Sequence, residues 1–426
     1  MTSSINTLLA EQAGDFDLWT WVCGALARSL HLHLPDAHGP RHPYLEHIKA
    51  LRPEHPGIAT GAIGYLTDPV ECETALTNGT SDVVFLGRPL ITDAAFPNKA
   101  AENKIEDIRY CVSCNNCWRS IIEAGAVTCD NNPEVGEPDE HLVAPPSITS
   151  RRHVVITGTG VAALEAAHTA AAHGHKATVL GDHEAFGGKT RLHAQMPGGE
   201  NLSSVYDYQY LRAQQLGAKF ELVRQVSIED VLSCDPDVVL LATGFRSARP
   251  EWLPEEWFTQ GLIPSLRDMA KQLTQGMGRA PGRAVIVDQD HTEMTYATAL
   301  RMAKYFDQIT LVTSRERFAN DVSLIDRQGI LRRLFESHVE LICHVEPEGV
   351  TQLEEGQFAL RNVYNSALAT LDSVTAVIHA SSRVPNDCLR EPLCAIGLEV
   401  ISIGDCKKPR PLVAPTREGY DIANEL

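Results

Sequence analysis

The residues that decide the fold read Val154-Val-Ile-Thr-Gly158-Thr-Gly160-Val-Ala-Ala163. The apolar run predicts a short buried strand, and the glycines predict a tight turn that leads into a helix. A second strand is expected at Ala177-Thr-Val-Leu180. In a Rossmann-type unit, Gly158 makes the turn, Gly160 lets the backbone approach a diphosphate, and Ala163 allows close packing of helix on sheet. The stretch therefore predicts a dinucleotide-binding unit.

Residues later in the chain add to this nucleotide site. The acid that should end the second strand and bind a ribose is replaced by Gly181, with Asp182 one position late. Asp182 is therefore a weaker candidate than the glycine turn. Thr243-Gly244 follows the buried run Val238–Leu241, and Gly404-Asp405 ends another strand. Small residues and an acid at strand ends favour ligand binding, although packing or a helix N-cap at Asp405 are the alternatives.

The middle of the chain repeats the strand pattern without the glycines. Strands are expected at residues 282–288 and 308–313, and the loop between them contains Asp288 and Asp290. Carboxylates in this loop would repel a diphosphate. This part is expected to fold as a Rossmann-type unit that does not bind a nicotinamide nucleotide.

Four cysteines upstream form a second motif, Cys111-Val-Ser-Cys114-Asn-Asn-Cys117 followed by Cys129. Three thiols at a period of three with one distant fourth can surround a [4Fe–4S] cluster. Zinc sites more often use paired CxxC units or CxxC with histidines. The spacing predicts an iron–sulfur centre, with a zinc site and a chance grouping of buried cysteines as alternatives.

Composition is that of a globular protein of 426 residues, with 43% hydrophobic and 22% charged residues. A formal net charge of −18 disfavours nucleic acid and anionic membrane surfaces as partners. No apolar stretch approaches the roughly 20 residues of a membrane span, and no signal peptide is expected. Eleven cysteines without disulfide-like spacing suggest a reducing compartment, so the cytoplasm is the expected location.

The order of these motifs resembles one family. The cysteine motif, the Gly158–Ala163 turn, Ala242-Thr-Gly244 and Gly404-Asp-x-x-x-Pro-Arg410 are similar to those of the iron–sulfur flavoproteins of the trimethylamine, dimethylamine and histamine dehydrogenase group. The 2,4-dienoyl-CoA reductases and related NADH:flavin oxidoreductases, which are Old Yellow Enzyme-like, share this plan. The resemblance implies an α/β chain with part of an FMN-binding (β/α)8 barrel, a [4Fe–4S] segment, and glutathione-reductase-like Rossmann domains that bind FAD or ADP.

The resemblance also implies a division of the chain into parts. The expected parts are an incomplete FMN-type barrel at residues 1–105, the iron–sulfur cluster segment at 106–148, the FAD- or ADP-binding domain at 149–250 and 371–426, and a degenerate NAD(P)-binding-like domain at 251–370.

The front of the chain resembles only the last three β/α units of that barrel. Phe16–Trp21, Pro56–Gly61 and Ser81–Gly87 resemble the sixth, seventh and eighth strands. A complete barrel takes about 250 residues, whereas 110 residues precede Cys111. Three strands cannot close a barrel, and their open edges would expose backbone groups. The expectation is a second chain that carries barrel strands one to five, with a truncated remnant as the alternative.

The family's FMN phosphate site maps onto four residues of this fragment. Gly61 and Gly64 follow the seventh strand, and Gly87 and Arg88 end the eighth. The guanidinium of Arg88 offers a bidentate fork to a phosphate, and a structural salt bridge is its alternative role. The family's catalytic residues lie in the missing half of the barrel, so the catalytic residues are unknown.

The resemblance implies an oxidoreductase component of the amine dehydrogenase or N-demethylase type. Electrons would pass from FMN through the [4Fe–4S] cluster to an external acceptor such as an electron-transfer flavoprotein. One alternative is an NAD(P)H-dependent 2,4-dienoyl-CoA or enoate reductase, so the small-molecule substrate is an amine or an enoyl compound. The other alternative is a non-catalytic electron-transfer subunit or an inactive remnant.

Overall fold

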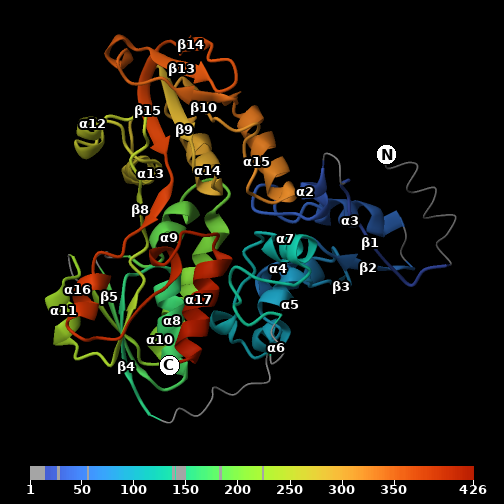
Figure 1. The fold of residues 1–426 in the computed structure, drawn as a ribbon. Coiled ribbons are helices and arrows are strands. Elements are labelled where there is room, and N and C mark those ends of the chain that lie inside the picture. The colour runs from blue at the N-terminus through green and yellow to red at the C-terminus, as the bar shows by residue number, and fades with distance from the viewer. Residues whose placement is uncertain are drawn as a thin grey trace. The chain divides into compact units, whose positions relative to one another are not determined.

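The structure, a computed structural model, describes residues 15–25, 29–54, 57–136, 140, 150–181, 185–222 and 225–426. Contacts between residues divide the chain into two compact units. The first unit consists of residues 1–138 and 324–329, and the second of residues 139–323 and 330–426. Figure 1 shows the elements of both units.

The first unit contains a parallel sheet in which β2 (Ala59–Ala62) lies between β1 (Leu18–Thr20) and β3 (Val83–Val84). Each strand falls within or beside a segment where the sequence predicts one, but each is only two to four residues long. Among the described residues, β1 and β3 have a strand neighbour on one side only. The helices and turns of this unit are α2 (Leu30–His33), α3 (Leu45–Leu51), η1 (Arg52–Glu54), α4 (Pro69–Thr77), α5 (Arg88–Thr92), α6 (Phe96–Ala101), η2 (Ile105–Asp107) and α7 (Asn116–Ala124).

A capping box fixes the start of α4. The Asp68 side chain accepts a hydrogen bond from the backbone N–H of Val70, and Glu71 bonds back to the N–H of Asp68. Pro69 at the first helical position needs no hydrogen-bond partner for its nitrogen. The helix buries Ala75 against Ala62 and Leu66, so a small core lies beside β2.

The second unit is built around a parallel sheet in the order β17-β7-β4-β5-β6. Its central strands β4 (His153–Thr157) and β7 (Val238–Leu241) are buried throughout, as expected for a sheet covered on both faces. The other strands are β5 (Lys176–Gly181), β6 (Lys219–Leu222) and β17 (Val400–Ser402).

Alternate residues of β4 face two different cores, because side chains in a strand alternate in direction. Val154 and Ile156 pack with the helices α8 (Val161–Ala172) and α17 (Val413–Asn424), whereas Val155 packs with residues of α11 (Ile228–Ser233) and α16 (Arg390–Ala395). Figure 1 shows α8, α10 and α17 on one side of this sheet and α11 and α16 on the other. The remaining elements around it are α9 (Gly188–Ala194), η3 (Glu200–Leu202), α10 (Ser203–Gln215) and η5 (Gly404–Cys406).

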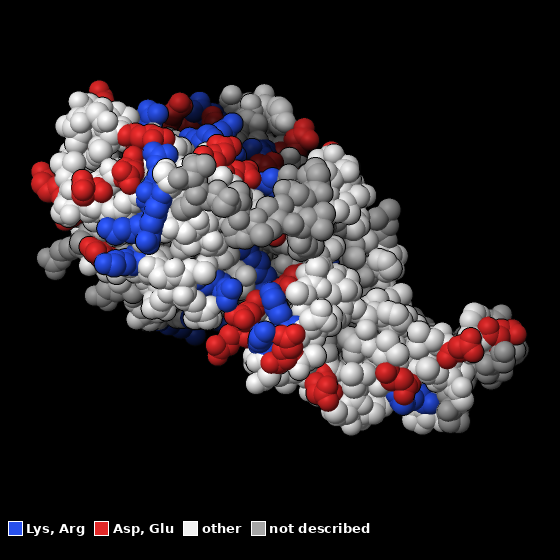
Figure 2. All heavy atoms as spheres, turned by 90° about the horizontal axis from the view of Figure 1, so that it is seen from below, with Lys and Arg blue, Asp and Glu red and all other residues white. Residues whose placement is uncertain are grey.

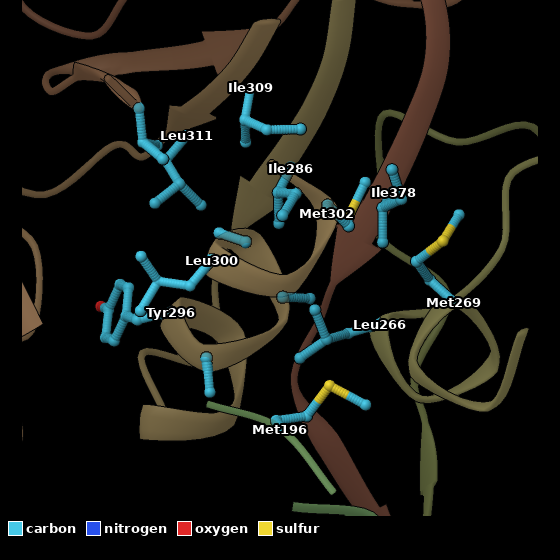
Figure 3. Packing of buried hydrophobic residues seen from close by; sticks show 14 of the residues in the cluster. Met196, Leu266, Met269, Ile286, Tyr296, Leu300, Met302, Ile309, Leu311 and Ile378 are labelled. Carbon is cyan, nitrogen blue, oxygen red and sulfur yellow. The ribbon is translucent and has the colours of Figure 1, made fainter. Parts of the chain in front are cut away.

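A second parallel sheet has the order β11-β10-β9-β15. Its strands are β9 (Arg283–Asp288), β10 (Gln308–Val312), β11 (Glu340–Ile342) and β15 (Val374–Ala380). One face packs on α13 (Leu266–Gln275) and α14 (Glu293–Met302), where Ile286 and Ile309 meet Leu300 and Met302 (Figure 3). The other face packs on an antiparallel sheet of β12 (Val345–Pro347), β13 (Phe358–Asn362) and β14 (Leu368–Leu371).

Strands β8 (Phe245–Ser247) and β16 (Arg383–Pro385) pair in an antiparallel direction. In the sequence, each lies between a strand of one parallel sheet and a strand of the other. β15 belongs to the second sheet, because it pairs with β9. The chain therefore returns to the first sheet later than residue 371, where the sequence analysis placed the boundary. The apolar run of β15 fits either sheet, so the pattern alone does not locate this boundary. The other elements are α12 (Glu255–Thr259), α15 (Leu324–Glu336) and η4 (Leu353–Glu355).

Candidate nucleotide cavity and cysteine segment

The turn between β4 and α8 has the geometry needed to receive a diphosphate. Gly158 has a φ of 110°, and a Cβ there would lie 2.3 Å from the carbonyl oxygen of Ala242, so only glycine fits. Gly160 caps α8 without a side-chain hydrogen bond, and no heavy atom beyond its neighbours lies within 4 Å of where its Cβ would be. The first N–H groups of α8 are therefore open to an anion. Ala163 is buried in the core beneath this turn.

A cavity of about 930 Å³ opens at the turn. Residues that follow three strands of the first sheet line it: Gly158 and Gly160 after β4, Thr243 and Gly244 after β7, and Asp405 after β17. The carboxyl ends of parallel strands are where such folds bind ligands. The cavity therefore brings together most of the residues that the sequence analysis assigned to a dinucleotide.

Asp405 lies within η5 and is buried, so it is not the N-cap that the sequence analysis considered as its alternative. Its carboxylate accepts hydrogen bonds from Nζ of Lys189 and, at 3.2 Å, from the backbone N–H of Arg410. Burial lowers the pKa of Lys189, and the charge of Asp405 acts in the opposite direction. Gly404 has a φ of 61° and donates its N–H to Glu418 at 2.8 Å.

Thr243 and Gly244 form a bend that borders the cavity. The hydroxyl of Thr243 donates to the carbonyl oxygen of Asn386. Gly244 has a φ of 77°, and no heavy atom beyond its neighbours lies within 4 Å of where its Cβ would be. The backbone is thus exposed to the cavity at this position.

The ribose end of the site differs from the usual pattern at Gly181. A Cβ at Gly181 would lie 2.2 Å from Cγ2 of Thr159, so an acid does not fit at the end of β5 unless Thr159 moves. Asp182 lies outside the described residues, and its assignment stays a prediction.

The matching loop of the second sheet is filled by the chain's own carboxylates. Asp288 is buried at the end of β9 and accepts hydrogen bonds from the N–H of His291 at 2.9 Å and the hydroxyl of Tyr296 at 2.8 Å. Asp290 accepts from the N–H of Thr292 at 3.0 Å and the hydroxyl of Thr295 at 2.7 Å. Burial and the charge of Asp288 raise the pKa of Asp290. The loop before α14 therefore presents carboxylates where a nucleotide-binding unit presents N–H groups.

The four cysteines of the predicted cluster lie close enough to influence one another. Burial raises the pKa of Cys129 to about 12, and the charge of Cys111 adds to this increase. Burial and then the charges of Asp130, Cys129 and Cys111 raise the pKa of Cys114, and burial followed by the charge of Cys111 raises that of Cys117. Across the described ranges, however, no three histidine, cysteine or acidic side chains are grouped as they would be around a metal ion.

The backbone of the cysteine segment suits thiolate ligands. Ser113 and Asn115 both have a φ of 55°, which produces tight turns between the cysteines. The N–H of Ser113 donates to Sγ of Cys111 at 3.4 Å. Such N–H groups stabilise thiolates and tune iron–sulfur clusters. The chemistry of the donors fits a cluster, and the cluster itself stays a prediction.

The residues assigned to FMN have structural partners in the first unit. Nη1 of Arg88 donates to Oδ1 of Asn115 at 2.6 Å, so Arg88 lies beside the cysteine segment. A Cβ at Gly61 would lie 2.2 Å from Cε2 of Phe85, and one at Gly64 would lie 2.5 Å from Cε2 of Tyr44. Gly87 is the N-cap of α5. Packing therefore accounts for Gly61 and Gly64, and the FMN role of all four residues stays a prediction.

No family model matches the chain. The chain is 35% identical over 182 residues to a probable N-methylproline demethylase of Rhizobium meliloti (strain 1021), which covers 42% of this chain and 26% of that protein. It is 26% identical over 385 residues to the bilirubin reductase of Mediterraneibacter gnavus (strain CC55_001C), which covers 90% of this chain and 57% of that protein. A structure of histamine dehydrogenase from Rhizobium sp. 4-9 matches 100% of this chain and 63% of its own length, with a TM-score of 0.85 and 22% identity.

The relatives of this chain are the trimethylamine-dehydrogenase-like NADH:flavin oxidoreductases. The alignments cover the C-terminal part of each relative. The alignments span 26% and 57% of the length of these two curated relatives. The resemblance stated from the motifs is thus confirmed, as is an α/β fold with parallel sheets.

Four residues in and beside the cavity were not predicted from the sequence. The charged groups of Lys189, Arg267 and Arg383 lie around the ring of Phe245, although the four residues lie far apart in the chain. The pair Gly187-Gly188 directly before Lys189 was a usable signal, because Gly188 packs on Gly160: a Cβ at Gly188 would lie 3.1 Å from Cα of Gly160.

Within the described ranges, none of the helices has both the length and the apolar character that crossing a bilayer requires.

Proposed function

We propose that this chain is the cofactor-carrying, C-terminal portion of an iron–sulfur flavoprotein oxidoreductase of the amine dehydrogenase or N-demethylase type. The observation that carries the proposal is the cavity at the carboxyl ends of β4, β7 and β17, with Gly160 open to a diphosphate. The family relationship supports the same assignment.

The size of the cavity favours FAD over ADP. Ligand pockets usually measure about 300–1,000 Å³, and this cavity of about 930 Å³ is near the upper limit. It extends from the glycine turn past Asp405 to Ser265 and Lys271 near α13. A nucleotide that ends at its diphosphate would use only the part beside the turn.

The chain's own residues would bind and orient this cofactor. The N–H groups at the start of α8 would hold the diphosphate, and Asp405 would accept a hydrogen bond from a hydroxyl of the second half. FAD, when bound, supplies hydride and single-electron chemistry. Cys111, Cys114, Cys117 and Cys129 would ligate a [4Fe–4S] cluster, whose role is single-electron transfer.

The second sheet favours an amine dehydrogenase over an NAD(P)H-dependent enoate reductase. Asp288 and Asp290 place negative charge in the loop where the reductase must hold a diphosphate. Two of the relatives are named for amine substrates, N-methylproline and histamine. The similarity to bilirubin reductase is the reason to keep the reductase as a second candidate.

The three-stranded sheet of the first unit would need further strands to form an FMN-binding barrel. Its edge strands and their flanks expose five large apolar side chains: Phe16, Leu18, Val22, Val83 and Phe85. Exposed apolar residues beside unpaired strand edges are suited to pairing with another sheet. The proposed occupant is a second chain that carries barrel strands one to five, so that FMN would bind at Gly61, Gly64, Gly87 and Arg88 of the composite barrel.

Anaerobic purification from the native host tests these assignments. Iron, sulfide and flavin are measured, and the polypeptides are separated by gel electrophoresis. About four irons, FAD, FMN and a stoichiometric second chain are expected, with flavin reduced by small secondary or tertiary amines and reoxidised by an acceptor such as an electron-transfer flavoprotein. A lone chain without flavin or iron would overturn the proposal in favour of a non-catalytic remnant.

A further inference from the structure

Three cations surround the ring of Phe245, which lines the cavity together with two of them, Lys189 and Arg267. Nζ of Lys189 lies 5.6 Å from the centre of the Phe245 ring, and Cζ of Arg267 and of Arg383 lie 5.6 Å and 5.5 Å from it. They come from α9, α13 and β16, so tertiary folding assembles the group. A ring that attracts cations through its π face can hold such a cluster together.

The cluster gives the cavity an excess of positive charge. Four basic residues line the cavity, Lys189, Arg246, Arg267 and Lys271, against two acids, Asp268 and Asp405. Arg383 lies beside the ring of Phe245 and is not one of the residues that line the cavity. Its charge counteracts the rise in the pKa of Asp290 that burial causes. The chain as a whole has a net charge of −18, and the face in Figure 2 carries many acidic side chains. Local positive charge of this kind favours an anionic ligand.

The position of the cluster indicates which part of a dinucleotide it meets. The glycine turn follows β4, and the ribose-binding position of a Rossmann unit is at the end of β5. Phe245 directly follows Gly244 after β7, and Lys189 pairs with Asp405 after β17. Because β7 and β17 lie on the opposite side of β4 from β5, the cluster lies toward the half of the ligand away from the adenosine.

We propose that the charges of Lys189, Arg267 and Arg383 together stabilise negative charge on the second half of the bound dinucleotide. This inference rests on the proposed binding of FAD, whose ring system is neutral when oxidised and anionic when reduced. Cationic groups beside a flavin ring tune its electronics. The chain therefore binds reduced FAD more tightly than oxidised FAD.

Two anaerobic titrations of the metal-reconstituted chain test this preference, one with oxidised FAD and one with FAD reduced beforehand. Dithionite supplies two electrons and is oxidised to sulfite, and water supplies one proton, which yields the anion FADH⁻. Neutralisation of one cation in Arg383→Gln is expected to lower the ratio of the dissociation constant of oxidised FAD to that of reduced FAD about tenfold, because one attractive interaction with the anionic ring is lost. A tenfold change corresponds to a midpoint potential lower by ~30 mV.

Matched variants separate charge from general damage. Arg383→Lys keeps the charge and should keep the ratio near that of the natural chain, and Arg267→Gln should reproduce the effect of Arg383→Gln. Arg279→Gln removes an exposed cation that pairs with Asp307 and should leave the ratio unchanged. Equal affinity for both forms of FAD, unaltered in Arg383→Gln and Arg267→Gln, would overturn the inference while leaving FAD binding intact. Failure of either form of FAD to bind would instead overturn the proposed function.

Discussion

At the scale of single residues, Tyr296 stabilises the loop between β9 and α14, which corresponds to the glycine turn of the first sheet. Its hydroxyl donates to Asp288 at 2.8 Å and accepts the N–H of Ala319 at 2.7 Å, and the side chain is fully buried. Burial and the charge of Asp288 raise the pKa of Tyr296 far above its usual value. The residue is thus a neutral hydrogen-bond donor for a buried carboxylate at any ordinary pH.

Tyr296→Phe should therefore destabilise the second unit. Loss of the hydroxyl removes one of the hydrogen bonds that Asp288 accepts and leaves the N–H of Ala319 without its Tyr296 partner, and a buried group left unsatisfied costs about 1–3 kcal/mol. Urea unfolding at neutral pH measures the change. Tyr364→Phe is the control, because Tyr364 is 71% exposed, and equal stability of the two variants would contradict the role given to Tyr296.

Glu71 should make the stability of the first unit depend on pH. Burial would raise its pKa, but hydrogen bonds from His42, the N–H of Thr67 and Arg41 outweigh burial and lower the pKa from 4.5 to about 2. A carboxylate with a depressed pKa stabilises the fold above its unfolded pKa, and the stabilisation is lost as the pH falls from about 5 toward 2.

The prediction is checked by comparing the natural chain with Glu71→Gln. Urea unfolding should show the natural chain to be more stable at pH 7 and the difference to shrink at pH 3. A difference that does not change over this range would show that the Glu71 charge contributes nothing.

Local patterns predict some residues of the site and miss others for a physical reason. Gly158, Gly160, Thr243 and Gly244 line the cavity and are predictable, because the role of each depends only on the strand before it and the turn in which it lies. Lys189, Arg267 and Arg383 are not, since their grouping depends on α9, α13 and β16 meeting at Phe245. The pairing of Asp405 with Lys189 was invisible for the same reason.

At the scale of elements, two similar strand–loop–helix units differ in one respect. Between β4 and α8 the backbone is bare at Gly160, whereas between β9 and α14 the side chains of Asp288 and Asp290 accept the hydrogen bonds of the loop. The N–H groups of His291 and Thr292 donate to these carboxylates, so they are not open to an anion. The sequence predicted this contrast from the absence of glycine, and the structure adds the hydrogen bonds that fix the acids in place.

This contrast predicts that nicotinamide nucleotides do not reduce the flavin. Stopped-flow mixing of the flavin-loaded chain with NADH or NADPH should leave the flavin absorbance unchanged on the time scale of amine turnover, because neither nucleotide is held at the second sheet. Chemical reduction with dithionite serves as the positive control. Rapid bleaching by either nucleotide would refute the assignment and favour the enoate reductase.

At the scale of the whole molecule, the chain combines two units whose sheets differ in completeness. Among the residues that the structure describes, the first sheet of the second unit has five parallel strands with cores on both faces, whereas the sheet of the first unit has three short strands. The order of elements was predictable because each strand has a distinct apolar run. The point at which the chain returns to the first sheet was not, since β15 reads as a buried strand in either sheet.

The central claim is that the glycine turn holds the diphosphate of FAD, and Gly160→Val tests it most directly. Gly160 has a φ of −80°, and the space beside its Cβ position is open, so valine should leave the fold and thermal unfolding unchanged while its side chain enters the cavity. Equilibrium titration with FAD should show saturable binding by the natural chain and loss of at least about tenfold in affinity, 1.4 kcal/mol, in the variant. Unchanged FAD affinity in a folded Gly160→Val chain would contradict the account.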